Sequence, residues 1–399
     1  MTRPVLATVT DAIAPFHAGG KEQRTAELTR RLTDRFDVHV HTMRWWGAGT
    51  WRHEGVTHHG VCRPHAMYVG GRRSIRQAVA FALGCLRLLV ARFDVLEADH
   101  MPYLHLPVLA LVAKVRRRPL VVTWHEVWSR DYWRDYLGPA GTLAWAFERF
   151  TMRLPDLVVA ASAETALRIG EVVRVPVVVA PNGVDLASVD AALAGTDDVP
   201  TVDVVTVGRL LPHKRVDMLL DALGGGVSAR VIGRGPQEGF LTARAAEQGL
   251  DVTVHTDVDD PAELYRLVAA ARVFVLPSAR EGFGIVALEA VACGLPVITT
   301  AAPDNLARHL VADAPGGVVC ADDVTALAHA IRTTLDDPPD RTGAPAWLAH
   351  HGWDGTADRV AAALGSVLPR AVVSAAPAVP ALPAVEPLPL APPTVGIPS

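Results

Sequence analysis

The chain has 399 residues, half of them hydrophobic, and a formal net charge of −4. This length suits two domains with sizeable cores, and the charge gives no reason to expect nucleic-acid binding. Four widely spaced cysteines indicate free thiols in a reducing compartment. The N-terminus lacks the apolar core of a signal peptide, and the apolar stretches 78–90 and 103–115 are too short to cross a bilayer. We expect a cytoplasmic protein, with contact at the inner face of the membrane left open.

Short apolar runs alternate with helical patterns from the beginning of the chain to the end. The first half predicts strands at 5–9, 38–42, 95–98, 120–123, 157–160 and 177–180, and helices at 21–33, 75–92 and 143–153. The second half predicts strands at 202–207, 229–232, 252–255, 273–276 and 296–299, and helices at 216–223, 240–248, 262–270 and 285–293. Apolar strands joined by helices indicate parallel sheets covered on both faces. The fold class is therefore α/β, with two Rossmann-like, doubly wound domains.

The segment Asn182-Gly183-Val184-Asp185 has turn chemistry and lies between the two series of strands. We therefore place the first domain at 1–183 and the second from 184 onward. The Pro-, Ala- and Val-rich segment 370–399 has no periodic pattern and is predicted to be a disordered extension.

Ligands of open α/β sheets bind beyond the carboxyl ends of the strands, so the loops there are the candidate sites. The first loop ends in Gly19-Gly20, where backbone N–H groups at a helix N-terminus suit an anion; a flexible turn is the alternative. A later loop places Arg209 and Lys214 after the strand 202–207. Two fixed cations suit a diphosphate, and we prefer this reading to a solvated basic turn.

The loop beginning at Gly233 resembles a dinucleotide fingerprint, but Glu238 stands where the third glycine belongs. A hydride-transfer cofactor is therefore poorly supported, although the loop could still line a nucleotide pocket. Two other patterns, Asp257-Val258-Asp259 and His58-His59, are too common or too isolated to indicate a metal site. We predict no catalytic metal and no bound cofactor.

The segment EGFGIVALEAVACGLP carries the strongest signal. Glu289 is the one carboxylate in an otherwise apolar helix, and a buried carboxylate requires a polar partner. Glu281 precedes a glycine turn eight residues earlier, at the N-terminus of the same helix. Both acids suit hydroxyl groups, Glu289 those of a ribose and Glu281 those of a sugar. The alternative is a structural role, with Glu289 paired to a buried arginine and Glu281 capping the helix.

In the first domain, His125 follows the strand 120–123 and suits a hydrogen bond to a reacting sugar or phosphate. Asp99-His100, at another strand end, is a weaker candidate. Tryptophans and tyrosines gather near Trp45 and around His125, and basic residues occur at 72–76 and 116–118. The aromatic residues suit sugar rings or a lipid edge, and the basic residues suit an anionic membrane or an acidic acceptor. The alternatives are domain packing for the first set and a solvated surface for the second.

In their order, these motifs resemble the retaining nucleotide-sugar glycosyltransferases of family 4, which have the GT-B fold. The resemblance covers roughly residues 1–368 and is most specific in the E-x7-E pattern of Glu281 and Glu289. It implies an N-terminal acceptor domain, a donor domain at 184–352 and a helix at 353–369 that crosses back to the first domain. The residues that it assigns to donor binding are Gly19, Gly20, Arg209, Lys214, Gly233, Glu281, Gly282, Phe283, Gly284, Ile285 and Glu289.

By the same resemblance His125, Glu281, Arg209 and Lys214 are the catalytic residues, and a hexose passes with retention from a nucleoside diphosphate to a hydroxyl acceptor without a metal. UDP or GDP is favoured over ADP. The acceptor is not fixed: a glycolipid, a polysaccharide precursor or a small-molecule glycoside would each fit. A nucleotide-sugar epimerase on the same fold and a non-catalytic sugar-nucleotide-binding scaffold remain the alternatives.

Overall fold

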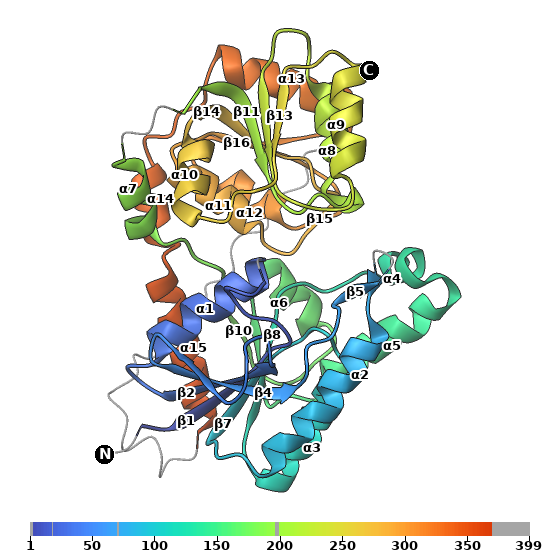
Figure 1. The fold of residues 1–399 in the computed structure, drawn as a ribbon, viewed down its shortest axis with the longest axis vertical. Helices are drawn as coiled ribbons and strands as arrows, with labels where there is room; N and C mark the ends of the chain where they lie inside the picture. Colours follow the sequence, from blue (N-terminus) through green and yellow to red (C-terminus); the bar gives the residue numbers. More distant parts are fainter. Residues whose placement is uncertain (1–2, 18, 70–71, 196–198, 369–399) are drawn as a thin grey trace.

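The computed structural model describes residues 3–17, 19–69, 72–195 and 199–368, so the predicted disordered segment 370–399 lies outside it. The described chain forms two α/β domains stacked along the long axis of the molecule (Figure 1). Each domain is a parallel sheet with helices on both faces, which confirms the predicted fold class.

The N-terminal sheet has eight strands in the order β10-β9-β8-β7-β1-β2-β4-β3, and its neighbours are parallel except for the β3–β4 hairpin. The central strands are apolar on both faces because helices cover both. The strands are β1 (Val5–Val9), β2 (Asp37–Met43), β3 (Trp51–His53), β4 (Val56–Cys62), β7 (Val95–Asp99), β8 (Leu120–Trp124), β9 (Leu157–Ala160) and β10 (Val177–Val179), with a separate pair β5 (Tyr68–Val69) and β6 (Arg72–Arg73).

The helices of this domain divide between the two faces of the sheet, with α1 and α15 on one face and α2 and α3 on the other (Figure 1). In chain order they are α1 (Gly20–Leu32), α2 (Ile75–Gly84), the 3-10 turn η1 (Cys85–Leu89), α3 (His105–Arg116), α4 (Arg130–Leu137), η2 (Gly138–Ala140), α5 (Gly141–Thr151), α6 (Ala163–Gly170) and, from the end of the chain, α15 (Trp353–Val367).

The C-terminal sheet is fully parallel, in the order β13-β12-β11-β14-β16-β18. Its strands are β11 (Val202–Val207), β12 (Ala229–Ile232), β13 (Val252–His255), β14 (Ala271–Leu276), β16 (Val297–Thr300) and β18 (Gly317–Cys320), with a short pair β15 (Arg280–Glu281) and β17 (Asp304–Asn305) beside it. Its helices are α7 (Leu186–Leu193), η3 (Pro212–Lys214), α8 (Val216–Ala222), α9 (Glu238–Glu247), α10 (Pro261–Ala269), α11 (Ile285–Ala292), α12 (Ala307–Asp313), α13 (Val324–Asp336) and α14 (Ala344–Ala349).

The chain crosses between the domains twice, and the two crossings lie together. Val184 forms a β-bridge with Gly352, and the Val184 N–H donates to the His351 carbonyl at 2.9 Å. After this crossing, α15 packs on α1 and on strands of the N-terminal sheet, and its Trp353 side chain is fully buried there. The last helix of the described chain therefore completes the core of the first domain.

One predicted helix and one strand that was not predicted differ from the sequence-based expectation for physical reasons. The helix predicted at 75–92 ends at Gly84 and continues only as the turn η1. A Cβ built on Gly84 would lie 2.8 Å from the Val61 carbonyl oxygen, so β4 approaches the helix too closely for any larger residue. The strand β4 itself was not predicted, because its central His58 and His59 break the apolar pattern.

Candidate active site

Each sheet has one point where the strand order reverses, and the candidate residues gather there. In the C-terminal sheet this switch point lies between β11 and β14, because β12 and β13 add on one side and β16 and β18 on the other. A hollow opens at the carboxyl ends of these strands, lined by Thr206, Val207, Gly208, Arg209, Leu210, Lys214, Val216, Val231, Ile232, Leu276, Pro277 and Ser278. Arg209 and Lys214 thus share one hollow.

Lys214 and Glu281 form an ion pair beside this hollow. The same Glu281 oxygen, Oε1, accepts a hydrogen bond from the Ser278 hydroxyl at 2.9 Å. The Ala279 N–H donates to the His213 carbonyl at 2.8 Å, so the loops after β11 and β14 are tied together. Burial and the nearby positive charges lower the pKa of His213 to about 3. The C-terminal switch point is therefore electropositive, and Glu281 is the carboxylate that the structure places beside its cations.

Arg209 reaches across to the other domain. Its Nη1 donates to the hydroxyl of Tyr68, on β5 of the N-terminal domain, at 2.9 Å. Arg73 lies over the ring of the same tyrosine, 5.6 Å from its centre. The guanidinium of Arg209 therefore sits at the boundary between the domains, where a ligand bound in the hollow would meet both.

The glycine turn before α11 packs directly against the N-terminal domain. A Cβ on Gly282 would lie 2.6 Å from the His125 carbonyl oxygen, so only glycine allows this approach. Gly284 precedes α11 with a φ of 84°, which favours glycine for a second reason. The next two side chains, Phe283 and Ile285, are buried. Because a Cβ on Gly20 would lie 3.1 Å from the Ile285 side chain, the first turn of α1 also touches this segment.

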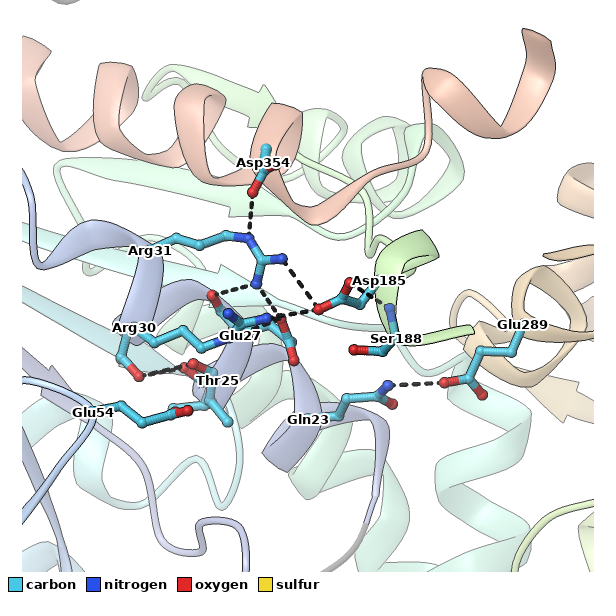
Figure 2. Close-up of polar contacts among 12 residues, drawn as sticks. Gln23, Thr25, Glu27, Arg30, Arg31, Glu54, Asp185, Ser188, Glu289 and Asp354 are labelled. Carbon is cyan, nitrogen blue, oxygen red and sulfur yellow. Dashed lines mark hydrogen bonds and ion pairs between the residues drawn. The ribbon is translucent and has the colours of Figure 1, made fainter. Parts of the chain in front are cut away.

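Glu289 is buried and bridges the domains by another route. Its Oε1 accepts a hydrogen bond from Gln23 Nε2, on α1, at 2.9 Å (Figure 2). The same oxygen accepts from the Tyr265 hydroxyl, on α10, at 3.4 Å. Burial raises the pKa of Glu289, and these two donors lower it by less. Among the residues that the structure describes, no arginine pairs with Glu289 and no side chain caps α11. Glu289 and Glu281 have separate partners among the described residues.

The N-terminal sheet has its own switch point, between β1 and β7, and a dense ionic cluster occupies it. Lys21, on α1, donates to Asp11 Oδ1 at 2.7 Å and lies 3.7 Å from Asp99 Oδ2. His125 Nε2 lies 2.7 Å from Asp99 Oδ1. Arg73 Nη1 donates to the second oxygen of Asp11 at 2.6 Å. The cluster thus fixes the orientation of the His125 ring and joins four separate segments of chain.

The charges of this cluster compensate one another. Burial alone would raise the pKa of Asp11, but Lys21 and Arg73 hold it well below its usual range. Burial would likewise lower the pKa of Lys21, but Asp11, Glu22 and Asp99 raise it above its usual value. Asp11 and Lys21 are therefore charged at neutral pH, and Lys21 and Arg73 each have an acidic partner within the protein.

A second hollow lies between the domains and contains Arg280, the residue before Glu281. Its guanidinium packs on two rings of the N-terminal domain, 4.6 Å from the centre of Trp128 and 4.3 Å from that of Tyr132. Glu126 lies 3.8 Å from Arg280 Nη1. This cation–π contact joins the segment that carries Glu281 to the loop that carries His125.

The remaining predicted positions have local roles. Gly19 adjoins Glu22, and Gly233 packs against the backbone of Gly208. The Asp257-Val258-Asp259 triplet pairs with Arg234. Within the described ranges, no group of three or more His, Cys, Asp or Glu residues is arranged to hold a metal ion.

Several residues that contact the candidate site were not predicted. No motif or periodic pattern marks most of them, because their contacts depend on how the loops and domains come together: Asp11, Lys21, Gln23, Tyr68, Tyr265, Ser278 and Arg280. Asp11 alone had a usable signal, because it stands two residues after β1 at the carboxyl edge of the sheet.

Comparison with known families agrees with this geometry. The chain matches the family described as glycosyl transferases group 1 over residues 198–344, and glycosyltransferase family 4 over residues 18–188. The chain belongs to glycosyltransferase family 4. This confirms the resemblance seen in the motifs, and with it membership of a family of glycosyltransferases.

Two curated relatives are from Mycobacterium tuberculosis. A glycogen synthase is 32% identical over 260 residues, which cover 62% of this chain and 61% of that protein. A GDP-mannose-dependent alpha-(1-6)-phosphatidylinositol dimannoside mannosyltransferase is 34% identical over 142 residues, 34% of this chain and 36% of that protein. The chain thus spans about three fifths of the first relative and about a third of the second.

Solved structures extend the likeness to both domains. Trehalose-6-phosphate synthase has a TM-score of 0.73 at 13% identity, covering 92% of this chain and 100% of that one. HepE from Anabaena, solved in complex with UDP and glucose, has a TM-score of 0.63 at 18% identity, covering 91% and 100%. At these identities the likeness shows the fold alone, which is the predicted GT-B arrangement of two Rossmann-like domains.

Proposed function

We propose that this family 4 protein transfers a hexose-type sugar, with retention, from a nucleoside-diphosphate sugar to a hydroxyl acceptor. The observation that carries the proposal is the hollow at the C-terminal switch point, where Arg209 and Lys214 lie together and Lys214 meets Glu281. The relatives support the donor class: one is GDP-mannose-dependent by name, and one structure holds UDP and glucose. On these grounds we favour UDP or GDP as the nucleotide.

The donor diphosphate would take the place of Glu281 as the partner of Lys214. In the structure Glu281 neutralises the lysine, and the Tyr68 hydroxyl accepts from Arg209. Phosphate oxygens between these cations would release Glu281 to accept hydrogen bonds from the sugar hydroxyls. Gly282 and Gly284 would bring backbone N–H groups to the same place at the start of α11. Glu289 would bind the ribose by exchanging its Gln23 or Tyr265 contact.

Catalysis would come mainly from stabilising the leaving group. The bond between the anomeric carbon and the phosphate oxygen breaks, and negative charge grows on the diphosphate where Arg209 and Lys214 already lie. The acceptor oxygen forms its bond from the same face, and its proton passes to the departing phosphate oxygen. His125, oriented by Asp99, would hydrogen-bond the reacting sugar from the N-terminal domain. In this scheme the two cations do the work of a metal, so we propose metal-independent transfer.

The acceptor would enter from the N-terminal side of the boundary, between the His125 loop and Tyr68. We propose a cytoplasmic setting, because all four cysteines are free thiols. Within the described ranges, none of the helices has both the length and the apolar character that a membrane crossing requires.

Binding of the donor can be measured directly by thermal shift with UDP-glucose, GDP-mannose and ADP-glucose. A ligand at a hundred times its dissociation constant stabilises the folded state by about 2.7 kcal/mol. We expect stabilisation by a UDP or GDP sugar, slow hydrolysis of that donor without acceptor, and loss of both in Lys214→Ala. A protein that shows neither stabilisation nor hydrolysis with any of the three would contradict the proposal. Binding without hydrolysis or transfer would indicate a scaffold.

A further inference from the structure

One face of the N-terminal domain exposes a continuous apolar stripe. Ile75, Val79 and Leu83 are four residues apart on α2 and therefore share one side of the helix; Leu86 and Val90 continue the stripe through η1 and just beyond it. The exposed fractions are 73% for Ile75, 60% for Leu83 and 88% for Val90. A helix of a globular protein normally turns such a stripe toward the core. Here the stripe faces away from it.

The neighbouring helix extends the stripe into a broader surface. On α3, Leu111 and Val115 are also four residues apart and exposed, and α3 packs beside α2 and η1. Figure 1 shows α2 and α3 together on the outer side of the sheet, opposite α1 and α15. The apolar face of this domain is thus made of Ile75, Val79, Leu83, Leu86, Val90, Leu111 and Val115.

The charged side chains on the segments that carry the apolar face are all basic. The segments 75–92 and 105–118 contain seven Arg and Lys residues but no Asp or Glu, although the whole chain has a net charge of −4. One of the seven, Arg118, pairs with Asp94 at 3.3 Å. The other six are exposed, and within the described part of the chain none has an acidic partner: Arg76, Arg87, Arg92, Lys114, Arg116 and Arg117.

We propose that the apolar face docks the protein on an anionic lipid bilayer. Aliphatic side chains in a row insert into the acyl boundary, while arginine and lysine reach the anionic headgroups beside them. A second copy of the chain fits this face poorly, because two-fold pairing would bring the six cations of each copy together. Nucleic acid fits poorly as well, because the exposed row has no aromatic ring for base stacking.

The position of the face relates docking to the candidate site. The N-terminus of α2 lies two residues after Arg73, whose guanidinium contacts Asp11 and the Tyr68 ring at the domain boundary. A protein docked through α2 would therefore hold the acceptor side of that boundary near the headgroups. This orientation rests on the proposed function, whereas the docking itself does not.

Vesicle flotation with the purified full chain tests the docking. We expect co-flotation with phosphatidylcholine vesicles that contain 30% phosphatidylglycerol, little with pure phosphatidylcholine, and release by salt as charge screening increases. Leu83→Ser with Val90→Ser should weaken binding at least tenfold. Because each cation near an anionic surface adds to the attraction, Arg87→Glu with Arg92→Glu should weaken vesicle binding by more than tenfold.

Matched variants elsewhere on the surface serve as controls. Leu167→Ser removes an equally exposed leucine (62%) on α6, and Arg332→Glu reverses an exposed arginine on α13; neither should change flotation. Equal binding by Leu83→Ser/Val90→Ser and wild type would overturn the proposal, as would equal binding to both vesicle compositions. A wild-type dimer that dissociates on Leu83→Ser would also overturn it, because the face would then join two copies. Vesicle binding without sugar transfer would leave docking intact and contradict only the proposed function.

Discussion

The two sheets end in similar switch points, but they use their charges differently. At the N-terminal one, Lys21 and Arg73 are each held by buried acids. At the C-terminal one, among the residues that the structure describes, Lys214 pairs with a single carboxylate and Arg209 bonds only a tyrosine hydroxyl across the domain boundary. The first cluster is complete within the protein, whereas the second leaves cations available to an anionic ligand. The same architecture thus makes a structural joint at one switch point and a candidate binding site at the other.

The largest effect should come from removing the central cation of the N-terminal cluster. Lys21→Met leaves Asp11 and Asp99 buried with less compensation, so the free energy of unfolding should fall by about 3–5 kcal/mol in urea titrations. The depressed pKa of Asp11 gives the wild type stability that is present above the ordinary pKa of an aspartate and is lost as the pH falls through the folded value. Without Lys21 this contribution shrinks, so the deficit of the variant should be largest at neutral pH and smaller at pH 3. Adding Asp11→Asn should recover part of the loss. Unchanged stability would show that the two switch points do not differ as we describe.

The matching change in the C-terminal domain should affect activity instead. Lys214→Ala removes a cation aimed at the leaving group, and we expect kcat/KM for the donor to fall about 10²–10³-fold. Its loss of stability should be smaller than that of Lys21→Met, because Glu281 keeps the Ser278 hydroxyl. Lys214→Arg serves as the control and should retain part of the activity. Near-wild-type transfer by Lys214→Ala would refute the site assignment.

Contact between the two domains should have an intermediate effect. Arg280→Ala removes the cation between Trp128 and Tyr132, a contact of about 2 kcal/mol when desolvated. Since the loop of Glu281 would lose its anchor, kcat/KM should fall roughly tenfold or somewhat more. Arg280→Lys keeps a cation over the rings and should recover most of it. Small-angle scattering with saturating donor would show whether the two domains of the variant lie farther apart. Scattering profiles and rates identical to those of the wild type would show that the Arg280 contact does not hold the domains together.

The smallest effect that we expect is a gain in stability on replacing Glu289. Burial raises the pKa of Glu289, so the folded protein binds its proton more readily than the unfolded chain. Its contribution to stability is therefore present at low pH and lost as the pH rises through the folded value. Glu289→Gln should raise the melting temperature at pH 8 but not at pH 4, while donor affinity falls about tenfold because a charged acceptor is lost. A lower melting temperature at pH 8 would contradict this reading.

The difference between the two switch points also explains what could be predicted. Arg209, Lys214 and Glu281 belong to continuous motifs that follow β11 and β14, so the sequence indicated both their position and their chemistry. Asp11, Lys21, Arg73 and Asp99 lie far apart along the chain and meet only because β1 and β7 are neighbours. Arg73 was therefore read as a surface cation, and Lys21 only as the beginning of a helix. Sheet order decides such clusters, and periodicity along a chain does not report sheet order.

The path of α15 has a consequence for how the protein is made. Trp353, Ala361 and Leu364 fill the core between this helix, α1 and the N-terminal sheet. A ribosome must therefore translate the whole C-terminal domain before the N-terminal domain can bury its last face. During synthesis one face of the N-terminal sheet therefore stays uncovered until α15 is made, because this helix is encoded about 170 residues after the last strand of the domain, β10. A chaperone acting on the nascent chain would find its binding surface there.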